Sequence, residues 1–211
     1  MLTLFMACYC QLMMSGHPVG EALCGSVSVQ LAHTCDLDRE TLDRARDLLD
    51  VVFAGDLRDE DWEHCLGGLH ALAWLGDRLV GHASVIQRRL LHAGRALRAG
   101  YVEGVGVHPG WQGQGIGGQL MARLEAVIAR AYELGALGAT DRAAAFYARR
   151  GWIRWRGPTS ALTPAGVVAT PDDDGCIYVL LPTGTEGEPG GYVVADVSGG
   201  LTCGWRDGDC W

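Results

Sequence analysis

The spacing of apolar residues in the first quarter of the chain predicts a strand followed by a helix. Apolar and polar positions alternate over 27–33, the period of a half-buried strand. Over 42–53 the apolar residues recur every three or four positions, the spacing of one helical face. Asp36 or Asp38 is the expected N-cap of this helix. The stretch 56–63 is rich in Asp and Glu and is expected to form an acidic loop.

Three further strands are predicted next. Residues 69–75 and 78–91 are strand-like and are joined by a Gly76-Asp77 turn. Gly94 then turns the chain into a third strand over about 96–107.

The second half of the chain alternates between helices and strands. A helical apolar face follows Gly118, and a later helix has Asp141 as its N-cap and Gly151 as its C′ residue. Three strands complete the prediction, at 136–139, about 153–162 and 176–181. The order β-α-β-β-β-α-β-α-β predicts an α/β fold with a mixed sheet.

Length and composition favour a single domain over 23–211. The chain has 211 residues, of which 48% are hydrophobic, enough for one substantial core. Residues 1–22 begin with an apolar run too short to span a bilayer and without the positive region of a signal peptide, so we expect a disordered or upstream read-through extension. The Gly-rich stretch 184–200 is expected to be a flexible insertion.

Net charge limits the kinds of partner that we expect, and cysteine usage limits the metal sites and the cellular compartment. A formal net charge of -8 argues against nucleic acid or an anionic membrane and suits a cationic partner. None of the eight cysteines forms a C-x-x-C pair, and the histidines show no ligand spacing, so no metal is expected. Reduced thiols imply a cytoplasmic protein.

A glycine-rich loop lies between the strand ending near Val107 and the following helix. Glycines there let an anion approach the unpaired N–H groups of the helix N-terminus. Gly113, Gly115 and Gly118 satisfy the G-x-G-x-x-G dinucleotide fingerprint, but its acidic partner would be Glu133, still inside the helical pattern. Alternatively, the glycines only form a turn.

The same loop, from Gln112 to Gly117, matches the Gln/Arg-x-x-Gly-x-Gly/Ala motif, so the chain resembles the GNAT superfamily of N-acetyltransferases. This resemblance implies a mixed central sheet with helices on both faces and a splayed fourth strand that binds acetyl-CoA. It implies that the co-substrate is held by the strand and loop residues Val105, Gly106, Val107, Gln112, Gly113, Gln114, Gly115, Ile116 and Gly117.

From about Ser26 onward the chain resembles the aminoglycoside 2′-N-acetyltransferases of actinobacteria more closely. The matching blocks include 61–64, 100–105, 170–174 and the tail 205–211. What this resemblance implies is direct acetyl transfer from acetyl-CoA to an aminoglycoside 2′-amine within a ternary complex, by a homodimer, conferring antibiotic resistance.

The resemblance also assigns roles to individual residues. Glu103 is the expected proton acceptor, acting through water, and Tyr147 the general acid; their alternatives are an exposed strand carboxylate and core packing. The substrate-contacting positions that match the family are Asp56, Glu103, Gly104, Gly138, Asp172, Asp173, Asp209 and the carboxylate of Trp211. Each acid taken singly could equally belong to a solvated face.

Three details depart from the family pattern, and two other functions compete. Gly138 replaces a serine, Gly204 stands where an acid usually lies, and the insertion at 184–200 could shift the tail. A GNAT acetyltransferase for another cationic amine, such as a polyamine, a peptide or a cell-wall amino sugar, would also suit an acidic cleft. A non-catalytic acetyl-CoA-binding module is the alternative from another class.

Overall fold

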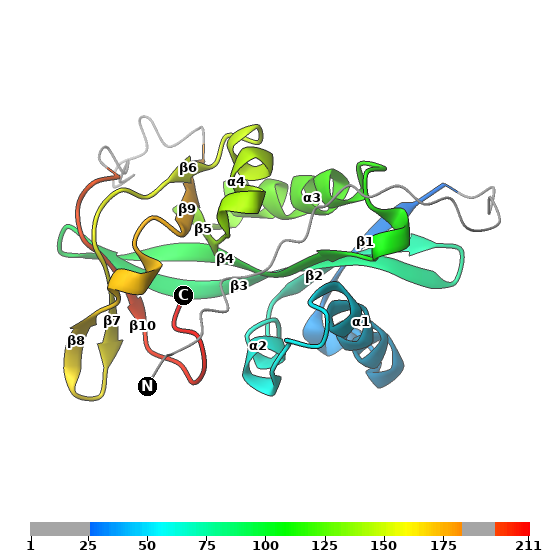
Figure 1. Cartoon of the computed structure of the whole chain (residues 1–211), viewed down its shortest axis with the longest axis horizontal. Helices are drawn as coiled ribbons and strands as arrows, with labels where there is room; N and C mark the ends of the chain where they lie inside the picture. The colour runs from blue at the N-terminus through cyan, green and yellow to red at the C-terminus, as the bar shows by residue number, and fades with distance from the viewer. Residues whose placement is uncertain (1–25, 183–196) are drawn as a thin grey trace.

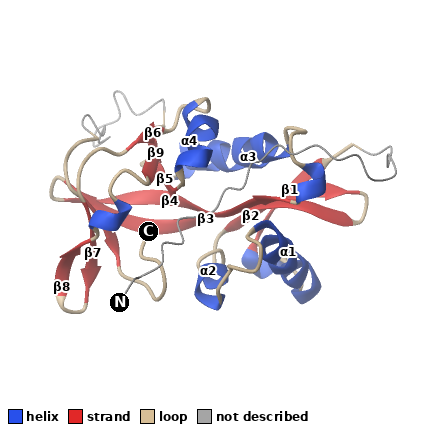
Figure 2. Cartoon of the chain, in the orientation of Figure 1, coloured by secondary structure: helices blue, strands red, loops and turns tan. Residues whose placement is uncertain are grey.

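The computed structural model of the chain describes residues 26–182 and 197–211. These residues form a ten-stranded mixed sheet with helices on both faces (Figure 1). Helices α1 (Arg39–Val52) and α2 (Asp59–Glu63) cover one face, and α3 (Ile116–Ala131) and α4 (Asp141–Ala148) cover the other (Figure 2). The predictions for 1–22 and 184–196 lie outside the described residues.

The first four strands pair in chain order as an antiparallel meander. They are β1 (Ser28–His33), β2 (Leu69–Leu75), β3 (Arg78–His92) and β4 (Arg95–Val107). The strand predictions for this half of the chain are therefore confirmed.

Helix α1 begins after Asp38, which decides between the two predicted caps. The Asp38 carboxylate accepts a hydrogen bond from the Thr41 backbone N–H at 2.7 Å. This satisfies one of the N–H groups that a helix start leaves unpaired. The apolar face of α1 is buried, as its spacing predicts, through Ala45, Leu48, Leu49 and Val52.

The acidic stretch predicted as a loop is wrong in part, because Asp59–Glu63 forms helix α2. Asp61 accepts a hydrogen bond from the Arg58 backbone N–H at 3.0 Å, and Trp62 is buried. Five residues are too few to show helical periodicity, so only the acidic composition was available, and it favoured a loop.

The strand predicted over 153–162 is also wrong as a single element. It divides into β6 (Ile153–Arg154) and β7 (Thr159–Thr163), which lie at distant places in the strand order β6-β9-β5-β4-β3-β10-β7-β8. The chain between them passes Gly157, where a Cβ would come within 1.9 Å of the Gly199 carbonyl oxygen.

The remaining strands pair across long sequence separations. Strand β9 (Ile177–Leu180) lies between β5 (Leu134–Gly138) and β6, close to where it was predicted. Strands β8 (Gly166–Ala169) and β10 (Leu201–Gly204) were not predicted; β10 lies between β3 and β7.

Helix α4 begins one residue earlier than predicted. Its N-cap is Thr140, so Asp141 is the first helical residue and not the cap. At its other end Gly151 has φ +87°, and hydrogen bonds run from the N–H of Trp152 to the Tyr147 carbonyl and from the N–H of Gly151 to the Ala148 carbonyl. This is the Schellman pattern, so the predicted C′ position of Gly151 is confirmed.

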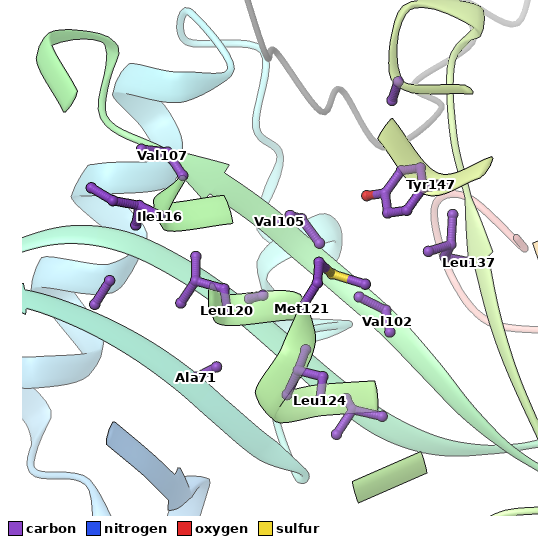
Figure 3. Packing of buried hydrophobic residues seen from close by; sticks show 14 of the residues in the cluster. Ala71, Val102, Val105, Val107, Ile116, Leu120, Met121, Leu124, Leu137 and Tyr147 are labelled. Atoms are coloured by element: carbon purple, nitrogen blue, oxygen red, sulfur yellow. The ribbon is translucent and has the colours of Figure 1, made fainter. Parts of the chain in front are cut away.

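The main core lies between α3 and the centre of the sheet. Figure 3 shows Leu120, Met121 and Leu124 of α3 packed over Val102 and Val105 of β4. All five side chains are almost fully buried, which anchors α3 firmly against β4.

Strands β4 and β5 pair over part of their length and then separate, as expected for a splayed fourth strand. They pair only where Ala99–Tyr101 lies beside Leu134–Ala136, although β4 continues to Val107. Beyond Tyr101, the β5 side of β4 therefore has no neighbouring strand among the described residues. The backbone N–H and C=O groups on that side of β4 are therefore available to another partner.

Candidate active site

A β-bulge lies in β4 at the point where the two strands separate. Ser84 pairs with Glu103 and His82 with Gly106, so β4 has one more residue than β3 between these pairs. Gly104 has φ +55°, and a Cβ there would lie 2.6 Å from the Cys65 sulfur. Glycine is therefore required at this bulge.

The predicted acetyl-CoA loop lies beside the part of β4 that, within the described residues, has no neighbouring strand on its β5 side. A cavity of about 240 Å³ is bordered by Val107 and by the loop and helix residues Trp111, Gln112, Gly113, Gly115, Ile116, Gly117, Gly118 and Phe146. Gly113 and Gly115 have φ +77° and +79°, and the Gln112 side chain donates to the Val107 carbonyl at 3.0 Å. Gln114 is exposed on this loop.

These features fit the CoA part of acetyl-CoA. The first N–H groups of α3 have no partner within the helix, and glycines leave them accessible to a pyrophosphate. Val105 and Gly106 lie on the part of β4 that has no described strand on its β5 side, where an extended pantetheine arm could pair with the backbone.

Glu103 is buried and forms an ion pair with Arg206 of the C-terminal tail. The Arg206 Nη1 atom donates to Glu103 Oε1 at 2.6 Å, and the two side chains are only 17% and 9% exposed. Burial raises the pKa of Glu103 above its ordinary value, although the Arg206 charge opposes the increase. The alternative of an exposed strand carboxylate is therefore wrong.

Arg206 also holds the tail together. Its Nε atom donates to the Asp209 carbonyl at 2.7 Å and its Nη2 atom to the Trp211 oxygen at 3.2 Å. Arg88 of β3 donates to the Cys210 carbonyl at 2.6 Å. The tail is thus fixed against β3 and β4, despite the insertion that precedes it.

Two predicted substrate acids meet at this tail. Burial, the nearby Asp209 charge and its other acidic neighbours raise the pKa of Asp173 to about 6. Burial likewise raises the pKa of Asp209, although Arg206 opposes it. Two partly buried carboxylates that repel each other favour a cation between them.

Gly138 lies at the end of β5, between the tail and Tyr101. A Cβ at Gly138 would lie 3.7 Å from the Tyr101 hydroxyl oxygen and 3.9 Å from the Trp211 carbonyl carbon. The buried Tyr101 hydroxyl has no hydrogen-bond partner within the described residues. The Trp211 indole donates to Thr170 at 2.9 Å, which connects the tail to the loop carrying Asp173.

The structure therefore brings only some of the predicted substrate residues together. Glu103, Gly138, Asp173, Asp209 and Trp211 surround one region near the β4 bulge at Gly104. Asp56 is exposed after α1, and Asp172 is exposed beside Asp173, so their roles stay predictions.

Sequence reasoning missed three residues of this region, Arg88, Tyr101 and Arg206. A basic residue in an acidic tail is a signal for an internal ion pair, and Arg206 could have been noticed on that ground. Arg88 and Tyr101 carried no such signal, since basic and aromatic residues are common in strands.

Tyr147 is 1% exposed on α4, and Figure 3 shows its ring near Val105 and Leu137 with the hydroxyl oxygen on the side facing β4. Its ring also lies 6.0 Å from Trp152 and 6.2 Å from Tyr178, between ring centroids. Tyr147 therefore packs in the core, while its hydroxyl points toward the splayed strand. Its role as an acid stays a prediction.

The position of Glu133, the acid that the dinucleotide fingerprint would use, does not support the dinucleotide alternative. The Glu133 carboxylate accepts a hydrogen bond from the Arg98 backbone N–H at 2.7 Å, on the first part of β4. It is thus tied to the sheet, away from the glycine loop.

The fold and the loop together define an acetyltransferase of the GNAT class. The family model for the acetyltransferase (GNAT) domain matches residues 35–154. Solved structures with this fold include Eis1 from Mycobacterium abscessus (23% identity, TM-score 0.53, covering 64% of this chain and 33% of that one). Another is Escherichia coli ElaA (21% identity, TM-score 0.52, covering 74% and 99%). The chain thus spans about a third of the length of Eis1.

A closer relative identifies the family within this class. An aminoglycoside 2′-N-acetyltransferase of Mycolicibacterium fortuitum is 48% identical over 187 residues, covering 87% of this chain and 92% of the relative. The chain belongs to the aminoglycoside 2′-N-acetyltransferase family.

Proposed function

We propose that this enzyme transfers the acetyl group of acetyl-CoA to the 2′-amine of aminoglycoside antibiotics, by direct attack within a ternary complex. The observation that carries the proposal is the set of acidic groups near the end of β5. Glu103, Asp173 and Asp209 lie there with the Trp211 terminus. A polycationic sugar needs several carboxylates around it, each hydrogen bond contributing roughly 1.5–3 kcal/mol.

Glu103 accepts the proton of the incoming ammonium through a water molecule. A carboxylate is a better base near neutral pH when its pKa is raised, and burial raises that of Glu103. Arg206 keeps this carboxylate ionised and oriented. The neutral amine nitrogen then attacks the thioester carbonyl carbon.

The backbone N–H groups of Val105 and Val107 lie on the splayed part of β4. We assign one of them to the thioester oxygen, whose negative charge grows as the amine attacks. When the C–S bond breaks, Tyr147 donates a proton to the departing sulfur.

The Tyr101 hydroxyl gives the proposal a further polar group. It is buried, has no hydrogen-bond partner among the described residues and lies next to Gly138. A buried polar group is normally paired, so a substrate hydroxyl or amine would satisfy it. The serine replaced by Gly138 would have supplied a hydroxyl at this place.

The remaining properties stay predictions. We propose a cytoplasmic homodimer that needs no metal and binds neither nucleic acid nor membrane. None of the helices within 26–182 and 197–211 is long and apolar enough to cross a membrane. Exposed apolar side chains on β7, β8 and the tail, Leu162, Val167, Val168 and Trp205, offer a surface for a second copy. Light scattering of the purified chain would measure its oligomeric state.

A thiol-release assay with acetyl-CoA tests the proposal. Aminoglycosides, polyamines and amino-terminal peptides would be compared at equal concentration. Aminoglycosides should give the highest kcat/KM. Preference for a polyamine or a peptide would retain the acetyltransferase and reject its substrate, and no thiol release with any amine would favour a binding module.

A further inference from the structure

A chain of side-chain hydrogen bonds runs through the sheet to the active-site bulge. The His82 Nδ1 atom lies 2.7 Å from the Gly104 carbonyl oxygen, and His82 Nε2 lies 2.9 Å from His70 Nδ1. His70 Nε2 lies 2.9 Å from Thr34 Oγ1, which accepts from the Gly67 backbone N–H at 2.8 Å. Both imidazoles are fully buried.

The acceptor at the end of this chain fixes the position of every proton in it. A carbonyl oxygen can only accept, so His82 must carry its proton on Nδ1. Burial lowers the pKa of His82 to about 4 and, with the nearby His82 ring, that of His70 to about 3, so both are neutral near pH 7. His82 Nε2 therefore accepts from His70 Nδ1–H, and His70 Nε2 accepts from the Thr34 hydroxyl. The Thr34 hydroxyl oxygen also lies 3.2 Å from the Gly68 carbonyl oxygen, and this longer contact shares the same proton.

The bulge explains why the Gly104 carbonyl needs a side-chain donor. The β3–β4 register jumps from Ser84–Glu103 to His82–Gly106, which takes Gly104 out of the ladder. A buried carbonyl without a donor costs roughly 1–3 kcal/mol. His82 supplies that donor, and Ser84 Oγ lies 3.4 Å from the carbonyl oxygen of Glu103.

We propose that His82, held by His70 and Thr34, is a positioning residue for acetyl transfer: it fixes the β4 bulge and thereby places Glu103 on one side and the Val105 N–H on the other. This inference rests on the proposed function for its kinetic part. The bulge has the left-handed backbone of Gly104 at its centre, so rotation there would move both neighbours together.

Two substitutions of His82 separate positioning from packing. His82→Phe keeps a ring beside Trp62, whose centroid is 6.1 Å away, but removes the donor. His82→Asn places its amide nitrogen where the imidazole Nδ1 atom lies, so it keeps the donor while losing the ring. If His82 only packs, the Phe variant should be the more active of the two. If His82 positions the bulge, the Asn variant should be the more active.

A buried histidine at the far end of the same strand gives a matched control. His92 of β3 is 6% exposed, and its Nδ1 atom lies 3.1 Å from the Gly200 carbonyl oxygen. It lies eight residues from Ser84, about 27 Å along a strand. His92→Phe therefore removes a similar hydrogen bond without touching the bulge.

The kinetic test measures kcat and both KM values for the three variants. In His82→Phe we expect kcat to fall roughly 10- to 100-fold with both KM values nearly unchanged, because misplacement of reacting groups acts on the transition state. His82→Asn should recover most of this loss, and His92→Phe should keep the wild-type kcat. A wild-type kcat in His82→Phe, or an Asn variant as slow as the Phe variant, would overturn the proposal.

Nitrogen-15 NMR of the wild-type enzyme tests the same proposal without turnover. The imidazole shifts should show Nδ1–H and bare Nε2 in both His70 and His82. In His82→Phe, the amide signals of Glu103, Gly104 and Val105 should move, and in His82→Asn they should return toward wild type. A protonated Nε2 in His82, or unmoved amide signals, would refute the inference even if aminoglycosides prove not to be the substrate.

Discussion

Replacing Arg206 with glutamine tests how the buried charges of the active site are balanced. The substitution removes the partner of Glu103 and the donor to the tail oxygens of Asp209 and Trp211. Both members of the ion pair are mostly buried, so Glu103 is left as an uncompensated carboxylate. Breaking such a pair typically costs about 3–5 kcal/mol.

This cost can be converted into a melting temperature. A domain of this length loses about 2–4 °C for each kcal/mol, so Arg206→Gln should melt roughly 6–20 °C lower at neutral pH. Protonation of Glu103 neutralises the carboxylate that has lost its partner. The loss should therefore shrink as the pH is lowered.

The second effect is on the pH dependence of catalysis. Burial raises the pKa of Glu103 while the Arg206 charge lowers it, so removing Arg206 leaves the increase opposed only by the weaker effect of the Arg88 charge. Glu103 must be ionised to accept a proton. The acidic limb of the kcat/KM profile should therefore move to higher pH.

The assay is a stopped or continuous thiol-release measurement between about pH 5 and 8, with calorimetric melting of the same samples. Glu125→Gln is the control, because it breaks the Arg150–Glu125 pair, whose side chains are 20% and 18% exposed. It should destabilise the enzyme and leave the acidic limb in place. An Arg206→Gln variant whose limb coincides with that of the wild type would refute the reasoning.

Four further predictions concern the proposed catalytic and substrate groups. Glu103→Gln should lower kcat roughly 10²- to 10⁴-fold while calorimetry shows unchanged acetyl-CoA binding, and a wild-type kcat would exclude Glu103 as the acceptor. Tyr147→Phe should cost less in thiol release, because a thiolate leaves tolerably well without a proton; wild-type rates would leave Tyr147 a packing role only. Asp173 has a pKa of about 6, so it loses its charge below that pH. The aminoglycoside KM should then rise as the pH falls through 6, and Asp173→Asn should flatten this rise; a flat wild-type profile argues against the contact. Removing Asp209 to Trp211 should raise the aminoglycoside KM and spare that of acetyl-CoA, whereas equal weakening of both would make the tail structural.

The elements with long periodic patterns were predictable from the sequence. Residues 78–91 are strand-like over their whole length, and α3 shows four turns of one apolar face, so both lie close to their predicted bounds. Short elements were not predictable: α2 has five residues and β6 two. Their structure depends on what they pack against, which local patterns do not contain.

The same distinction applies to the active site. The glycine loop was predictable, since positive φ angles restrict the choice of residue. The Glu103–Arg206 pair and the His70–His82 pair were not, because each joins residues brought together only by the sheet and the tail. Local patterns identify strands but not which side chains meet across them.

The position of the new acetyl group on the product tests the central claim most directly. Tobramycin carries a 2′-amine and kanamycin A a 2′-hydroxyl, which is a much weaker nucleophile. Mass spectrometry with NMR assignment should show one acetyl group on the 2′ nitrogen of tobramycin and little turnover of kanamycin A. Acetylation mainly at a 6′ or 3 amine, or equal turnover of both compounds, would contradict a pocket that presents the 2′ position to the thioester.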